Sequence, residues 1–226
     1  MVKSTRRSWM IGAAAASGCT ALPTIPEIPG RWLGYAGRRW GVRDDPFPAD
    51  PGLNRWAAGP RALKRREGHL ELTSRTDQTG PWGVELWTPL STPTRLEFEV
   101  TPQQGGLHPD DVVGLFLYRD GRCEVDIELT RWGDPQGPDT FHTFADRRVR
   151  SAPLGASTRR TQHALQLSPT HVRLESHGPL GALVSEAELC ACATASHILR
   201  INVWRRDVQV RPPTLVHVSV GFEPQT

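Results

Sequence analysis

The sequence predicts an all-β protein built as a β-sandwich, in which two antiparallel sheets pack face to face. Short segments with alternating apolar and polar residues recur along the chain, separated mostly by Gly, Pro, Asp or Ser, a pattern typical of strands joined by turns. No long segment has helical periodicity, and 21 Gly and 20 Pro among 226 residues favour turns. Other apolar runs are continuous, as in strands buried inside a sandwich.

The expected strands follow one another from residue 39 to residue 222. Residues 69–73 (HLELT) and 95–100 (RLEFEV) alternate, whereas residues 112–118 (VVGLFLY) form the most apolar run. A short helical piece is expected only around residues 185–190. The full set of expected strands is 39–43, 69–73, 84–87, 95–100, 112–118, 124–130, 164–167, 172–175, 198–204 and 215–222.

Residues 1–18 have the composition of an export signal. Basic residues precede an apolar run that is too short to span a bilayer, and small residues lead to Cys19. Residues 5–10 (TRRSWM) resemble a twin-arginine signal, and residues 16–19 (ASGC) resemble a lipobox, in which the Cys becomes lipidated and starts the mature chain. An ordinary cleaved signal peptide with an incidental Cys is the alternative.

The domain organisation follows from this leader. Residues 19–30 are Pro-rich and suit a tether, so the β-sandwich domain is expected to occupy residues 31–226. We therefore expect an exported protein, periplasmic or on the cell surface, held to a membrane only through a lipid on Cys19. We also expect a monomer.

Charge and cysteine content argue against nucleic-acid binding and against a zinc or redox site built from cysteines. The leader carries three basic residues and no acidic ones, so the remaining chain has 24 basic and 24 acidic residues from totals of 27 and 24. A formally neutral domain gives no sign of nucleic-acid binding. Cys123, Cys190 and Cys192 allow at most one intrachain disulfide, whose pairing stays open, and they lack the spacing of a zinc or redox site.

The segment CEVDIELTRWG, residues 123–133, places Glu124, Asp126 and Glu128 on every second residue. In a strand these carboxylates share one face, while the intervening Val125 and Ile127 share the other. Mutual repulsion should push the pKa values of the carboxylates apart, so that one group holds a proton while another stays ionised. Glycoside hydrolysis requires such a pair of carboxyl groups on either side of the scissile bond.

The five residues EVDIE closely resemble the signature of glycoside hydrolase family 16, whose fold is the concanavalin A-like jelly-roll sandwich. Residues 162–178 also resemble the hairpin of that family, and residues 199–204 and 215–224 its final strands. The resemblance implies that Glu124 is the nucleophile, that Glu128 is the general acid and then the base, and that Asp126 assists between them. It implies retaining endo-hydrolysis of a β-linked polysaccharide of glucan or galactan type. Many relatives hold structural calcium, so the resemblance allows that ion here, and we expect no other cofactor.

Aromatic residues and one His are candidates for substrate binding. Trp132 follows the signature and is the strongest candidate, because flat indoles suit the faces of sugar rings. Trp82 and Trp87 are further candidates for the same reason. Trp204 is expected to pack in the core or at the rim, since it belongs to an apolar strand. His142 either faces the same cleft and orients a carboxyl group or is a surface residue.

Two other functions fit the same pattern. A non-catalytic, lectin-like surface lipoprotein could bind carbohydrate with this fold, although a binder has no need for both Glu124 and Glu128. The three carboxylates could instead hold calcium, but ligands on one flat strand face diverge rather than surround an ion. The Arg-rich residues 146–160 fit an exposed basic loop or a contact with an anionic glycan.

Overall fold

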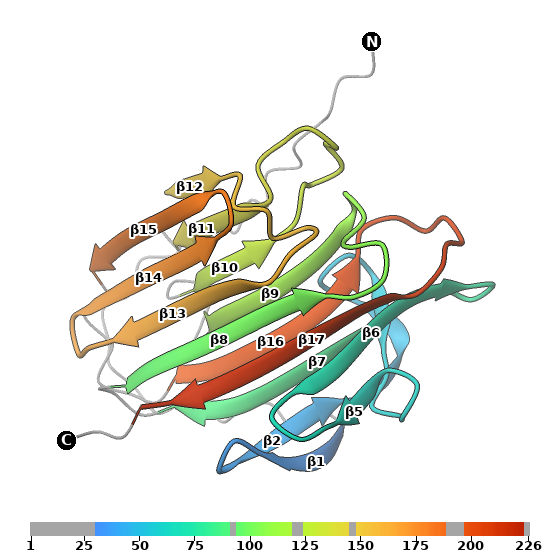
Figure 1. Cartoon of the computed structure of the whole chain (residues 1–226). Helices are drawn as coiled ribbons and strands as arrows, with labels where there is room; N and C mark the ends of the chain where they lie inside the picture. Colours follow the sequence, from blue (N-terminus) through green and yellow to red (C-terminus); the bar gives the residue numbers. More distant parts are fainter. Residues whose placement is uncertain (1–29, 91–93, 119–123, 145–147, 189–196, 224–226) are drawn as a thin grey trace, which may run out of the picture.

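The computed structural model describes residues 30–90, 94–118, 124–144, 148–188 and 197–223. These residues form two antiparallel sheets that lie one behind the other (Figure 1), which confirms the predicted β-sandwich. No helix among them is long and apolar enough to cross a membrane. The predicted export signal, most of the tether, the lipidation site Cys19 and the three other cysteines lie outside the described residues.

The first sheet carries the carboxylate strand β10 near one side. Strands far apart in the sequence are neighbours in it, since β16 pairs with both β7 and β9. Its strands lie in the order β1 (Gly30–Tyr35), β2 (Arg38–Arg43), β7 (Gly80–Leu90), β16 (His197–Arg205), β9 (Asp111–Tyr118), β10 (Val125–Leu129), β11 (Thr140–Phe144) and β12 (Val149–Ala152).

The second sheet covers the inner face of the first. Its strands lie in the order β5 (Leu63–Arg65), β6 (Leu70–Asp77), β17 (Thr214–Phe222), β8 (Thr94–Pro102), β13 (Thr161–Leu167), β14 (His171–Gly178) and β15 (Gly181–Glu188). The start of β7 also pairs with β6, and a hairpin of β3 (Asp45–Ala49) and β4 (Asn54–Trp56) adds to it in parallel, which joins the sheets at one edge.

The core lies between the two sheets and is built by the predicted alternation. In β10, Val125, Ile127 and Leu129 are buried among the apolar residues of the facing sheet. In β6 the residues at every second position are likewise buried, beginning with Leu70 and Leu72. Each fully buried residue of this kind stabilises the folded state by roughly 1.5–3 kcal/mol through removal from water. Because these residues must face the core, the residues between them on each strand point outward.

Each expected strand is present in the structure. The structure also contains shorter or more polar strands that the sequence did not predict. The helical piece expected around residues 185–190 is wrong for residues 185–188, which belong to β15. There Ser185 and Ala187 are buried and their neighbours are exposed, and Ser185 pairs with Leu174 of β14. A period of two is the signature of a strand rather than a helix.

Strand β12 forms one edge of the first sheet and accounts for part of the Arg-rich segment. Among the described residues it pairs only with β11, and Arg148, Val149 and Arg150 are exposed. The segment then folds inward, because the carboxylate of Asp139 accepts hydrogen bonds from the backbone N–H of Leu154 at 2.9 Å and of Ser157 at 3.1 Å. The expected exposure holds for Arg148 and Arg150, but residues 149–152 form a strand rather than a loop, and the turn at residues 154–157 is largely buried.

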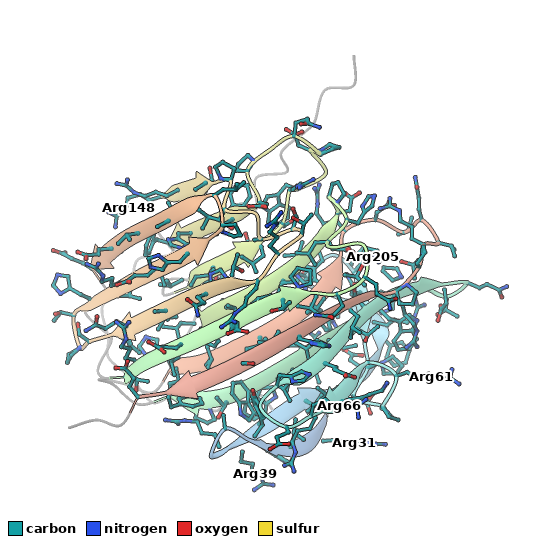
Figure 2. All side chains as sticks on the ribbon, viewed as in Figure 1. Arg31, Arg39, Arg61, Arg66, Arg148 and Arg205 are labelled. Carbon is teal, nitrogen blue, oxygen red and sulfur yellow. The ribbon has the colours of Figure 1, made fainter. Side chains whose placement is uncertain are left out.

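A buried ion pair links three strands at one end of the sandwich. Arg205 of β16 is 1% exposed and donates to the carboxylate of Asp111 of β9 at 2.8 Å. The guanidinium also donates to Thr214 Oγ1 of β17 at 2.9 Å, and that hydroxyl donates to Asp111 at 2.6 Å. Figure 2 shows Arg205 within the sandwich, whereas Arg39 and Arg148 extend from its periphery.

Asp111→Asn is expected to destabilise the protein by roughly 3–5 kcal/mol, because it leaves the buried guanidinium of Arg205 without a counter-charge. Urea unfolding measures this loss. The matched control is Arg173→Ala, which breaks a more exposed pair with Glu175 and should cost far less, because water screens such a pair. Similar losses in both variants would contradict the structural role given to the buried pair.

Candidate active site

A cleft of about 440 Å³ lies on the outer face of the first sheet, opposite the core. Its lining comes from β2, β7, β9, β10 and β16 together with the loop that carries Asp50. The lining residues are Arg43, Asp50, Pro51, Glu85, Gly114, Phe116, Glu124, Asp126, Glu128, Arg200, Asn202 and Trp204.

The structure brings Glu124, Asp126 and Glu128 together in this cleft. Glu124 directly precedes β10, and the other two carboxylates lie on the face of β10 that points away from the core. Because the alternate residues of β10 are buried in the core, the three carboxylates cannot turn inward without exposing those residues. Placing three acidic groups side by side in a partly enclosed space is the feature that the rest of the site must accommodate.

One row of the sheet leads from Glu128 across three neighbouring strands. Glu128 pairs in register with Gly114 of β9, Gly114 pairs with Asn202 of β16, and Asn202 pairs with Glu85 of β7. A Cβ atom at Gly114 would lie 2.5 Å from the side-chain oxygen of Asn202. Gly114 therefore leaves room for the Asn202 amide between the acidic groups at the two ends of the row.

A second row leads from Asp126 to the far edge of the sheet and is largely aromatic. It contains, in register order, Asp126, Phe116, Arg200, Trp87, Gly41 and Trp32. The Trp87 indole occupies the space above Gly41, where any Cβ would overlap it. Trp87 packs edge-on against Trp32 with ring centroids 5.1 Å apart, and Trp32 is 51% exposed. The row therefore ends at an accessible indole on β1.

Two arginines neutralise Glu85, an acidic residue that lines the cleft on β7. Glu85 is 1% exposed, and its Oε1 lies 2.7 Å from a guanidinium nitrogen of Arg200 and 3.6 Å from one of Arg43. Arg43 also donates to the carbonyl of Asp50 at 2.9 Å, which fixes the loop at the rim. Glu85 thus differs from the β10 carboxylates, because its charge is balanced and it holds Arg200 beside the cleft.

The three β10 carboxyl groups lie in unequal electrostatic surroundings. Burial, and then the charge of Glu124, raises the pKa of Glu128 to about 7. Burial and both neighbouring carboxylates raise the pKa of Asp126 well above its usual range. Burial also raises the pKa of Glu124, but the positive charge of Arg200 opposes that rise. The cation therefore favours the ionised form of Glu124, whereas Glu128 retains a proton near neutral pH.

Asp126 has an unused polar atom. Its Oδ1 is buried and has no hydrogen-bond partner within the described parts of the chain. A buried oxygen in that state is costly unless a water or a ligand satisfies it. Its position between Glu124 and Glu128 therefore makes Asp126 suited to a hydrogen bond with whatever occupies the cleft.

Trp204 and Trp132 form an aromatic pair at one end of the cleft. Trp204 is 7% exposed and lines the cleft, so it lies at the rim as expected. Trp132 packs edge-on against it with centroids 6.3 Å apart and is 39% exposed. Trp132 has a φ of 50°, and its backbone N–H donates to the hydroxyl of Thr130 at 3.1 Å. Trp132 thus extends the cleft beyond its lining, although it is not itself a lining residue.

His142 lies in the core, so both sequence interpretations of this residue are wrong. It pairs in register with Ile127, whose side chain points inward, and it is fully buried. Its ring nitrogens lie 3.0 Å from Ser185 Oγ and 2.7 Å from Ser176 Oγ, both on the facing sheet. Burial lowers the pKa of His142 to about 4, so a neutral ring bridges the two sheets.

The other two candidate tryptophans also lie outside the lining of the cleft. Trp82 lies near the start of β7. The guanidinium of Arg75 lies 5.0 Å from its ring centroid, and the indole N–H of Trp82 donates to Thr79 Oγ1 at 3.2 Å. Trp87 belongs to the aromatic row but is only 7% exposed. Sequence reasoning missed Trp32, Arg43, Arg200 and Asn202, which are isolated polar or aromatic residues until the register of the sheet aligns them.

Comparison with known proteins supports the fold rather than a particular activity. No protein-family model matches the sequence, and curated proteins give no match. Solved structures do match. A β-glucanase of Bacillus licheniformis aligns with a TM-score of 0.63 at 12% identity, over 83% of this chain and 92% of that one. A Bacteroides ovatus family 16 glycoside hydrolase in complex with an oligosaccharide product aligns with a TM-score of 0.62 at 9% identity, over 81% and 94%.

A third similar structure is described as a pseudo-enzyme. It is described as an immunostimulatory antigen and pseudo β-1,3-glucanase of Mycobacterium tuberculosis, and it aligns with a TM-score of 0.57 at 13% identity, over 82% of this chain and 91% of that one. Together these matches confirm the jelly-roll sandwich of glycoside hydrolase family 16. At such identities they leave the function to be argued from the cleft.

Glu128→Gln is expected to stabilise the protein above pH 7 and to leave it unchanged below pH 4.5. Between these values the folded state keeps the proton on Glu128 while the unfolded state releases it, so wild-type stability falls as pH rises through this window. Since each unit of pKa corresponds to about 1.4 kcal/mol, the gain in the free energy of unfolding is at most about 3.5 kcal/mol.

Urea unfolding on either side of this window measures the effect. Glu97→Gln serves as the matched control, because Glu97 has an exposed side chain on the outer face of the second sheet and should leave the pH dependence unchanged. A Glu128→Gln variant with the wild-type pH dependence would contradict the raised pKa.

Proposed function

We propose that this protein is a retaining, endo-acting glycoside hydrolase that cleaves a β-linked polysaccharide of glucan or galactan type. The observation that carries the proposal is the set of three carboxyl groups in one cleft, of which Glu128 holds a proton near neutral pH while Arg200 favours ionised Glu124. A proton donor beside an ionised carboxylate is what double-displacement glycoside hydrolysis needs.

In the first step Glu124 attacks the anomeric carbon of the sugar and forms an ester with it. Glu128 donates its proton to the glycosidic oxygen as that bond breaks, so the leaving chain departs as a neutral alcohol. In the second step Glu128, now ionised, takes a proton from the water that attacks the same carbon. The ester bond to Glu124 breaks, and both residues return to their starting states with net retention of configuration.

Asp126 has a positioning role in this proposal. Burial and the neighbouring carboxylates raise the pKa of Asp126 well above its usual range, which favours its protonated form, and a protonated Asp126 can donate a hydrogen bond to a neighbouring carboxylate. Donation to Glu124 would stabilise the charge that returns to Glu124 when the ester breaks. The Asn202 amide in the row of Glu128 offers a second polar contact on the other side.

The aromatic side chains suit a sugar chain that runs across the strands. Phe116 and Trp204 line the cleft, and Trp132 and Trp32 extend the aromatic surface beyond it in two directions. Flat apolar rings favour the faces of pyranose sugars. Similar structures described as β-glucanases lend weight to a glucan. The leader remains the basis for our further proposal that the protein is exported and lipidated at Cys19, and we also propose that it is a monomer.

The second candidate function is carbohydrate binding without catalysis. It draws support from the pseudo β-1,3-glucanase, which has the same fold at a comparable level of identity. A binding protein would use the cleft and its aromatic residues but would not depend on Glu124. The two functions therefore differ in the consequence of removing that carboxylate.

Glu124→Gln is expected to lower turnover of the cleaved glycan by roughly three orders of magnitude or more, because the amide cannot form the ester. Reducing-sugar release from a panel of β-glucans and algal galactans measures it, and Glu97→Gln is the control on the opposite sheet. Turnover that survives in Glu124→Gln would eliminate Glu124 as the nucleophile, and binding without turnover in the wild type would favour the lectin-like function.

The wild-type rate should fall above about pH 7 as Glu128 loses its proton.

Trp32→Ala is expected to weaken binding of polysaccharide but not of short oligosaccharides. Five strand-to-strand steps of about 4.8 Å separate Trp32 from Asp126, a span of roughly 24 Å that only a longer chain can cover. Loss of one aromatic contact should raise KM for the polymer roughly two- to tenfold with kcat unchanged, and Trp32→Phe should restore most of it. An equal effect on short and long substrates would show that Trp32 only supports the fold of β1.

A further inference from the structure

We propose that the outer face of the second sheet carries a site for a divalent transition-metal ion, formed by His69, Glu71 and His217. The ligand atoms that these three residues offer all lie within 4.8 Å of one another. This group lies on the side of the sandwich opposite the cleft, so the proposal is independent of the proposed glycoside hydrolase activity.

The sheet itself brings the three residues together. Glu71 of β6 and His217 of β17 are partners in register, and His217 Nε2 lies 4.0 Å from Glu71 Oε1. His69 precedes Glu71 by two residues, and its ring centroid lies 4.4 Å from that of His217. Val216 and Val218, on either side of His217, are buried in the core. The three side chains must therefore point outward, and their positions are fixed by the core beneath them.

The hydrogen bonding of His69 prepares one nitrogen for a metal. Its Nδ1 lies 3.2 Å from the carbonyl oxygen of Glu67, and a carbonyl can only accept, so Nδ1 carries the proton of the neutral ring. The lone pair then resides on Nε2, which is buried and has no hydrogen-bond partner in the described part of the chain. Metal-binding His residues characteristically donate their second ring nitrogen to a backbone carbonyl in this way.

Two imidazoles and one carboxylate select the class of metal. Zn²⁺, Co²⁺, Ni²⁺ and Cu²⁺ favour imidazole nitrogen, whereas Ca²⁺ and Mg²⁺ favour sites made of oxygen ligands. Bonds of about 2.0–2.2 Å require the ligand atoms to move closer by roughly 1 Å. The three residues are only partly buried, so their side chains can rotate by that amount and water can complete the coordination.

Arg66 is the competitor of the metal for Glu71. Its guanidinium donates to both carboxylate oxygens, at 2.9 and 3.3 Å, and its side chain is 51% exposed. Because that side chain is half exposed, water screens the ion pair, which makes it weak compared with coordination by three protein ligands. The metal should therefore displace Arg66, and removal of Arg66 should strengthen binding.

The experiment is a titration of the purified protein, without a polyhistidine tag, with Zn²⁺ by calorimetry and with Co²⁺ by visible absorption. We expect one Zn²⁺ per chain, a Co²⁺ spectrum with nitrogen ligation and a melting temperature that rises with Zn²⁺ concentration. His217→Ala and His69→Ala should weaken binding by about tenfold or more, whereas Arg66→Gln should tighten it roughly two- to fivefold.

His177→Ala is the matched control, because His177 lies 3.7 Å from Glu175 on the same sheet but belongs to no cluster of three potential ligands among the described residues. It should bind Zn²⁺ as the wild type does. Absence of Zn²⁺ binding in the wild type, or equal binding in His217→Ala and the wild type, would overturn the proposal. Arg66→Gln keeps all three ligands, so it tests the site even where a His variant unfolds. Glycan cleavage plays no part in these readouts.

Discussion

The fixed orientation of β10 is the constraint on which the rest of the molecule depends. Val125, Ile127 and Leu129 fill the space between the sheets, and a strand that buries them must send Glu124, Asp126 and Glu128 to the opposite face. Three acidic groups in a partly enclosed cleft oppose folding through lost hydration and mutual repulsion. The apolar inner face of the sandwich offsets that cost, and the proton retained by Glu128 reduces it. The same burial that destabilises the charged state gives the carboxyl groups their unequal acidities.

Much of the fold, and one strand of the site, could be predicted from the sequence because a period of two needs no knowledge of neighbouring strands. The outward face of β10 is an example. His142 shows the limit, because its strand has polar and apolar residues on both faces, and only its register with Ile127 decides that it points inward. Arg200 and Asn202 reach the cleft because β16 inserts between β7 and β9. Such an alignment depends on packing between segments far apart in the chain, which local patterns do not record.

The molecule also separates its chemistry between two outer faces. The face of the first sheet is hollowed and holds the β10 carboxyl groups together with Glu85, whose charge Arg43 and Arg200 balance. The face of the second sheet carries ion pairs and the cluster of His69, Glu71 and His217. A common apolar core supports both. Because similar structures include one described as a β-glucanase and one described as a pseudo β-1,3-glucanase, the residues of the faces rather than the architecture decide what each protein does.

The exposed edge at β12 has a consequence for how copies of the protein behave toward one another. An open strand edge invites a second chain to add its own strand, which is a common route to aggregation. Here Arg150 pairs in register with the inward-pointing His142, yet it is exposed at the border of the core, and Arg148 stands just outside the strand. A second copy that approached this edge would have to bury one guanidinium and bring like charges together. Among the described residues, Arg148 and Arg150 thus oppose the addition of a second strand at this edge.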